Sequence, residues 1–112
     1  MRKLIKKYFS SPDETMHPAE KIAIEVVNLG GHKLQRVTAQ PGWQWSKDLK
    51  PVLKTNSCQV DHLLYMISGE MVVRMDEGEE LTYTAGDIAS IAPGHDGWGI
   101  GGEPTVWLEL PH

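Results

Sequence analysis

The sequence predicts an all-β fold, most simply a jelly-roll barrel. Short stretches in which apolar and polar residues alternate recur along the chain. Gly, Pro and Asp turn signals separate them at intervals of roughly 8 to 12 residues, a pattern typical of sandwiches and barrels. Helix signals are poor, and a jelly roll is one way to give many short strands a single core. The 112 residues correspond to one domain, residues 1–112, in which we expect an arm over 1–20 and the barrel motifs over 38–110.

Each expected element begins and ends at a recognisable turn. The segment 4–9 could form a strand lying on a neighbouring subunit, and 16–25 is the best helix candidate. The remaining expected strands cover residues 22–27, 32–40, 58–67, 70–75, 81–84, 88–92 and 105–110. Gly78 in the acidic turn at 76–79 supplies the positive φ that a hairpin requires.

Composition excludes several classes of function. The net charge is −4, from 15 acidic against 11 basic residues, which argues against nucleic acid as the main partner. A single cysteine cannot form an intrachain disulfide, so we expect a reducing, cytoplasmic location. No apolar run approaches the roughly 20 residues of a membrane span, and we expect no membrane partner.

The order of the turn motifs resembles the cupin superfamily. The motifs are Ser68-Gly69-Glu70, then Ala85-Gly86-Asp87, then Pro93-Gly94-His95, and the stretch Pro41-Gly42-Trp43-Gln44-Trp45 is similar to one mostly bacterial branch without an agreed function. The resemblance covers nearly the whole chain. It implies a double-stranded β-helix, that is, a jelly-roll barrel, in a small single-domain conserved-barrel cupin that forms a homodimer.

The customary cupin metal ligands are replaced in this chain. Alignment on Gly69 places the family's glutamate at His62 and its two first-motif histidines at Asn56 and Cys58. The histidine of the second motif falls on Gly97. The usual site of three histidines and one glutamate is therefore not carried over at any of its four positions.

A different ligand set is available nearby. Residues of equal parity share one face of a strand, so Asn56, Cys58 and His62 are expected on the same face. The resemblance implies that this face points inward, which leaves Tyr65 pointing outward. In a straight strand Cys58 and His62 would lie about 13 Å apart, although a bend or bulge would bring them closer. Thiolate and imidazole bind Zn, Fe, Ni or Cu, and His95 is the best third ligand, with Asn56 and Asp96 as weaker candidates.

In the fold that the resemblance implies, the stretch 43–45 belongs to a strand that can line the cavity, and its tryptophans would form an apolar wall for a small organic molecule. Trp43, Trp45 and Trp98, together with Asn56, Met66 and Asp96, are the candidate ligand-binding residues. The alternative is that the tryptophans fill the barrel or an interface, and that Cys58 and His62 are ordinary wall residues. Three functions stay open: a small-molecule-binding barrel with or without metal, a metal-dependent oxygenase, isomerase or lyase, and a structural protein with a filled barrel.

Overall fold

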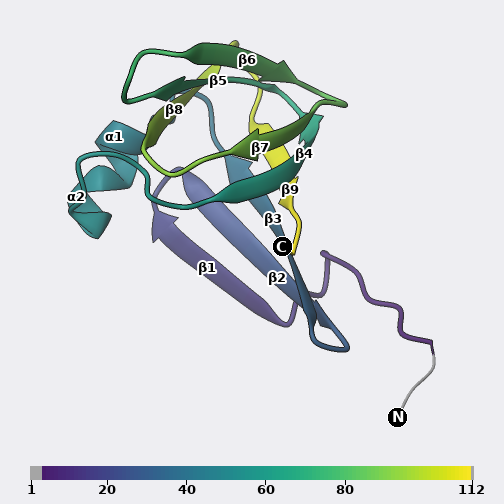
Figure 1. The fold of residues 1–112 in the computed structure, drawn as a ribbon. Coiled ribbons are helices and arrows are strands. Elements are labelled where there is room, and N and C mark those ends of the chain that lie inside the picture. Colours follow the sequence, from purple (N-terminus) through teal and green to yellow (C-terminus); the bar gives the residue numbers. More distant parts are fainter. Residues whose placement is uncertain (1–3, 112) are drawn as a thin grey trace.

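The structure is a computed structural model that describes residues 4–111. Nine strands and two short helices make up this part of the chain (Figure 1). The strands are β1 (Glu14–Ala19), β2 (Ile22–Leu29), β3 (His32–Ala39), β4 (His62–Ser68), β5 (Glu70–Met75), β6 (Glu80–Thr84), β7 (Ile88–Ile91), β8 (His95–Ile100) and β9 (Thr105–Glu109), and the helices are α1 (Trp45–Asp48) and α2 (Lys50–Leu53).

Two antiparallel sheets face each other across the core. The larger sheet has the strand order β1-β2-β3-β9-β4-β7, and the smaller sheet has the order β6-β5-β8. Figure 1 shows β5, β6 and β8 lying together over one end of the larger sheet, with both helices at one side. The predicted all-β jelly roll is confirmed.

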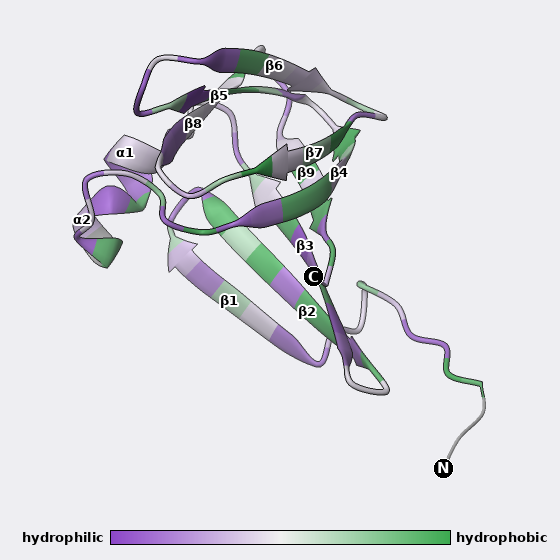
Figure 2. Ribbon diagram, viewed as in Figure 1, coloured by the Kyte–Doolittle hydropathy of each residue, from purple (hydrophilic) through white to green (hydrophobic). Residues whose placement is uncertain are grey.

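Alternation of side chains decides which face of each strand is buried. β2 is coloured mostly green and is interrupted by purple at its few polar residues, whereas β1 at the edge of the sheet is coloured mostly white and purple (Figure 2). The inward positions of the two sheets carry the core, which contains Ile22, Val37, Leu64, Met66 and Trp107, all at most 8% exposed. Tyr65, at the opposite parity, is 41% exposed and faces outward as predicted.

Glycines form the tight turns that connect neighbouring strands. Gly69 has φ 77° between β4 and β5, and Gly78 has φ 109° between β5 and β6. The amide of Gly78 donates to the carbonyl of Met75, which closes the hairpin predicted over the acidic turn.

Three local predictions were wrong. The segment 16–25 is not a helix, because it lies within β1, β2 and the tight turn between them. The expected strand over 43–45 is absent: Gln44 forms only an isolated β-bridge to Trp98, and Trp45 is already the first residue of α1. Residues 58–61 precede β4 rather than belonging to it, so the chain bends between Cys58 and His62.

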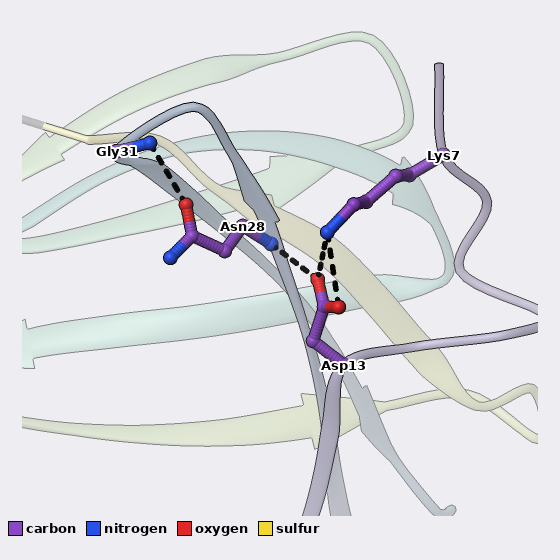
Figure 3. Close-up of polar contacts among 4 residues, drawn as sticks. All are labelled: Lys7, Asp13, Asn28 and Gly31. Carbon is purple, nitrogen blue, oxygen red and sulfur yellow. Dashed lines mark hydrogen bonds and ion pairs between the residues drawn. The ribbon is translucent and has the colours of Figure 1, made fainter. Parts of the chain in front are cut away.

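The N-terminal segment runs beside the β2–β3 hairpin, away from the barrel (Figure 1). Residues 4–13 form no strand, but β1 begins at Glu14, within the expected arm. The ammonium group of Lys7 lies 2.9 Å from the carboxylate of Asp13, which also accepts a 2.7 Å hydrogen bond from the amide of Asn28 (Figure 3). These contacts are at the surface and hold the segment against its own chain. No helix in the described part of the chain is long and apolar enough to cross a membrane.

Candidate metal centre and cavity

Three potential metal ligands meet where the two sheets approach each other. Cys58 lies in the loop before β4, His62 is the first residue of β4, and His95 is the first residue of β8. Their ligand atoms all lie within 4.8 Å of one another. The sequence therefore identified the three residues that converge, although they come from two sheets and a loop.

A bend in the chain brings the thiol to the imidazole. Sγ of Cys58 lies 3.8 Å from Nε2 of His62. In a straight strand the Cα atoms of the two residues would be about 13 Å apart. The amide of Cys58 donates to the carbonyl of His95 over 2.7 Å, and the amide of Gly94 donates to the carbonyl of Cys58. These backbone bonds fix the loop to β8 and turn Cys58 inward, where it is 5% exposed.

Both histidines are oriented by a second set of acceptors. Nδ1 of His62 donates to Oε1 of Glu109 over 2.6 Å, and Nδ1 of His95 donates to the carbonyl of Ala92 over 2.7 Å. Each ring therefore has Nε2 left as its ligand atom. Glu109 is itself held by Nε1 of Trp107, which donates to it over 2.9 Å. The donor set and its supports fit a borderline-soft divalent ion such as zinc.

Glu109 supports His62 in the candidate site and was not predicted from the sequence. It lies on β9 two positions after Trp107, so both side chains point to the inner face of that strand. A carboxylate at an inward position of an otherwise apolar strand is the signal that could have identified it.

Electrostatics favour an ion pair between Cys58 and His62 in the metal-free protein. Burial opposes ionisation of the thiol, but hydrogen bonds from His62, His95 and the backbone of Val60 outweigh it, and the pKa of Cys58 falls from 9.0 to about 6. Burial also opposes protonation of His62, yet its bonds with Cys58 and Glu109 raise its pKa from 6.5 to about 9. Near neutral pH the pair is thiolate and imidazolium.

The two shifts have opposite effects on stability. The depressed pKa of Cys58 stabilises the fold at high pH, and this contribution is lost as the pH falls from 9.0 through about 6. The raised pKa of His62 stabilises the fold at low pH, and this contribution is lost as the pH rises from 6.5 through about 9. Between about pH 6.5 and 9, folding mainly moves one proton from Cys58 to His62, so the two effects on the free energy of unfolding nearly cancel.

A cavity of about 710 Å³ opens beside the three ligands. This volume lies within the roughly 300–1,000 Å³ of small-molecule sites. Cys58, His62 and His95 contribute to its wall, and most of the remaining lining is apolar. The larger apolar lining residues are Ile22, Ile24, Val37, Trp43, Trp45, Leu49, Leu64, Met71, Val73, Ile91 and Trp107.

Trp43 occupies the space next to the customary histidine position at Gly97. A Cβ built on Gly97 would lie 3.5 Å from Cη2 of Trp43, and one on Gly99 would lie 2.5 Å from its Nε1. Nε1 of Trp43 donates to Oγ1 of Thr105 over 3.0 Å. The two glycines of β8 thus make room for an indole on the cavity wall.

The candidate ligand-binding residues separate into two groups. Trp43 and Trp45 line the cavity, as expected. Asn56 is exposed, Met66 is fully buried in the core, and Trp98 packs under the guanidinium of Arg74 at 5.3 Å; none of these three is part of the lining.

Asp96 also lies outside the cavity lining and has a positioning role. Its carboxylate accepts hydrogen bonds from the side-chain amide of Gln44 over 3.0 Å and from the backbone amide of Ser46 over 3.1 Å. It thereby ties the start of α1 to β8 and holds Trp45 at the cavity wall.

Comparison with known proteins agrees with this architecture. A model of the EutQ-like cupin domain matches residues 53–106, which include all three candidate ligands. The chain has the cupin fold, and its residues 53–106 are similar to this domain. No curated protein matches it in sequence.

Solved structures share the fold of this chain at low sequence identity. A protein of unknown function from Rhizobium leguminosarum bv. viciae 3841 superposes with a TM-score of 0.65 at 20% identity, covering 99% of this chain and 100% of the other. Ectoine synthase from P. lautus superposes with a TM-score of 0.68 at 14% identity, covering 96% of this chain and 78% of the other. The polyketide cyclase RemF from Streptomyces resistomycificus superposes with a TM-score of 0.67 at 13% identity, also covering 96% of this chain and 78% of the other. Identities this low establish the fold alone.

Proposed function

We propose that this cupin-fold protein binds a small organic molecule in its cavity, next to a divalent metal ion held by Cys58, His62 and His95. One observation carries the proposal: three ligand atoms lie within 4.8 Å of one another, and both imidazoles have Nδ1 engaged by an acceptor. Buried histidines that only fill space have no need to converge on a thiol. Zinc, iron, nickel or copper would each suit this donor set.

Such an ion would supply a Lewis acid with a coordination position left for a ligand, since three protein donors do not complete a tetrahedral site. The chain's own residues do the rest. Glu109 orients His62, the carbonyl of Ala92 orients His95, and the apolar wall excludes water from the bound molecule.

Elemental analysis tests the metal site. The protein is purified without chelator or histidine tag, beside Cys58→Ala, His62→Ala and the control His32→Ala, which removes an exposed imidazole at the start of β3. We expect close to one metal ion per chain in the wild type and in the control, and a clear loss in the other two. Background metal in all four proteins would contradict the proposal.

The second candidate is a metal-dependent enzyme of the oxygenase, isomerase or lyase type. The cavity favours it, because a three-ligand site beside an apolar chamber can place an organic substrate against the ion. Metal-loaded protein would be screened for oxygen consumption and for isomerisation of bound ligands. Turnover that disappears in Cys58→Ala distinguishes this candidate from simple binding, and ligand binding without turnover favours the first proposal.

We also propose a homodimer in a reducing, cytoplasmic environment, which keeps the Cys58 thiol available. Apolar side chains on the outer faces of β4 and β7 support an interface, because Tyr65 and Ile88 are paired neighbours with exposures of 41% and 71%. Ile67 on the same face is 44% exposed. Light scattering of the wild type and of Ile88→Asp gives the mass, and a monomer in both would exclude the dimer.

A further inference from the structure

The chemistry of the cavity wall limits what the proposed binding site can accept. Trp43, Trp45 and Trp107 all contribute to the lining. Nε1 of Trp43 is engaged by Thr105 and Nε1 of Trp107 by Glu109, so these two indoles have no donor left for a ligand. They present ring atoms instead, which favour stacking against a planar apolar body.

Polar groups occur on only a small part of the described lining. One group comprises the three candidate metal ligands with Glu109 and Gln35, which are paired neighbours on β9 and β3. The other comprises Lys33 and Asp61, both exposed at the rim. A sugar or a polyol needs hydrogen-bonding partners around its whole surface, and this wall does not provide them.

Charges at the polar end balance without a charged ligand. A divalent ion bound by Cys58, His62 and His95 would be balanced by the thiolate that it binds and by the neighbouring carboxylate of Glu109. Lys33 is the one Lys or Arg side chain among the described lining residues, and at the rim its charge is screened by water. A strongly acidic head group would therefore be desolvated without a partner.

We infer that the ligand is an uncharged, planar and largely aromatic molecule with one hydroxyl or carbonyl oxygen directed at the Cys58, His62 and His95 cluster. This inference rests on the proposed metal-binding function for the direction of the head group. The aromatic character of the ligand is inferred from the residues of the cavity wall alone. Gln35 provides an uncharged amide next to the cluster that can hydrogen-bond to the same oxygen.

Binding of simple probes tests the ligand class by calorimetry on zinc-loaded protein. Naphthol has an aromatic ring system and an uncharged hydroxyl group. Naphthalene sulfonate keeps the rings but carries a charged sulfonate in place of the hydroxyl, and glucose has no aromatic ring. We expect naphthol to bind most tightly, the sulfonate about tenfold more weakly, and glucose not at all. Equal or tighter binding of the sulfonate or of glucose would overturn the inference.

Two tryptophan variants locate the binding site. Trp43→Leu removes a cavity ring and should weaken naphthol binding about three- to tenfold, whereas Trp43→Phe keeps an aromatic face and should preserve most of it. Trp98→Leu is the matched control, since Trp98 packs outside the cavity against Arg74. Thermal unfolding checks that each variant is folded. An equal loss in Trp98→Leu, or no loss in Trp43→Leu, would contradict binding at this wall.

The metal-free protein separates this inference from the proposed function. If zinc is retained but naphthol binds no better than the sulfonate, the ligand class is wrong and the metal site stands. If zinc is not bound and naphthol still binds through Trp43, the metal site is wrong and the aromatic ligand class stands. If naphthol binds more weakly once zinc is removed, the result supports both an aromatic ligand and a ligand oxygen that points toward the metal ion.

Discussion

Replacing Glu109 by glutamine should weaken metal binding without removing any metal ligand. Oε1 of Glu109 accepts from Nδ1 of His62 over 2.6 Å and from Nε1 of Trp107 over 2.9 Å. The side chains of His62 and Glu109 are each 16% exposed, so water screens their interaction little. The amide of glutamine can still accept a hydrogen bond, but it carries no charge, and the imidazole becomes a weaker base.

The expected magnitude follows from the role of such supporting carboxylates. Loss of one typically lowers metal affinity about 10- to 100-fold, which is about 1.4 to 2.7 kcal/mol of binding free energy. Glu109→Ala should cost more, because it also leaves Nε1 of the buried Trp107 without its acceptor, at about 1–3 kcal/mol of folding stability.

Competition with a chromophoric zinc chelator at fixed pH measures the affinity of each variant. Glu103→Gln is the matched control, since it removes the same charge from an exposed position shortly before β9. With cobalt in place of zinc, the thiolate-to-metal absorption reports whether Cys58 stays bound. Affinity of Glu109→Gln within twofold of the wild type would refute the role of Glu109, and so would an equal loss in Glu103→Gln.

Two further predictions concern the thiol and the packing around Trp43. In the metal-free protein, thiolate absorbance of Cys58 should titrate near pH 6 and move toward its ordinary value in His62→Gln, while wild-type stability changes little between pH 6.5 and 9. A midpoint unchanged by the substitution would exclude the ion pair. Gly99→Ala should cost about 1–3 kcal/mol in urea unfolding, because its Cβ would meet Nε1 of Trp43 at 2.5 Å. Gly102→Ala, with no atom within 4 Å, should stay within about 0.5 kcal/mol, and equal effects would contradict this packing.

Strand parity and turn chemistry were enough to predict most of the fold. Gly69 and Gly78 have the positive φ values that their turns imply, and Tyr65 faces outward while Leu64 and Met66 face inward. These features depend on local sequence and on a period of two, so they can be read without knowing the tertiary contacts.

Where local sequence predicted the wrong structure, tertiary contacts determine the conformation that is observed. The stretch from Trp43 to Trp45 alternates like a strand, yet Asp96 accepts hydrogen bonds from Gln44 and from the backbone of Ser46 and so fixes the start of a helix there. Trp98 comes from the motif that suggested a cavity, but its parity on β8 turns it toward Arg74.

The candidate site was predicted in its members but not in its geometry. Parity placed Cys58 and His62 on one face, and the cupin resemblance implied that this face points inward and that His95 lies two positions before a customary ligand. The 3.8 Å approach of thiol and imidazole requires a bend that hydrogen bonds to β8 impose, and the carboxylate of Glu109 arrives from 47 residues away. Neither contact can be inferred from spacing along the chain.

X-ray absorption spectroscopy at the zinc edge, on protein loaded with one equivalent of zinc, tests the metal site most directly. We expect one sulfur ligand at about 2.3 Å and two imidazole nitrogens at about 2.0–2.1 Å, with the sulfur lost in Cys58→Ala. A zinc shell built only from oxygen and nitrogen in the wild type would contradict this expectation, because Cys58 would then take no part in binding the ion.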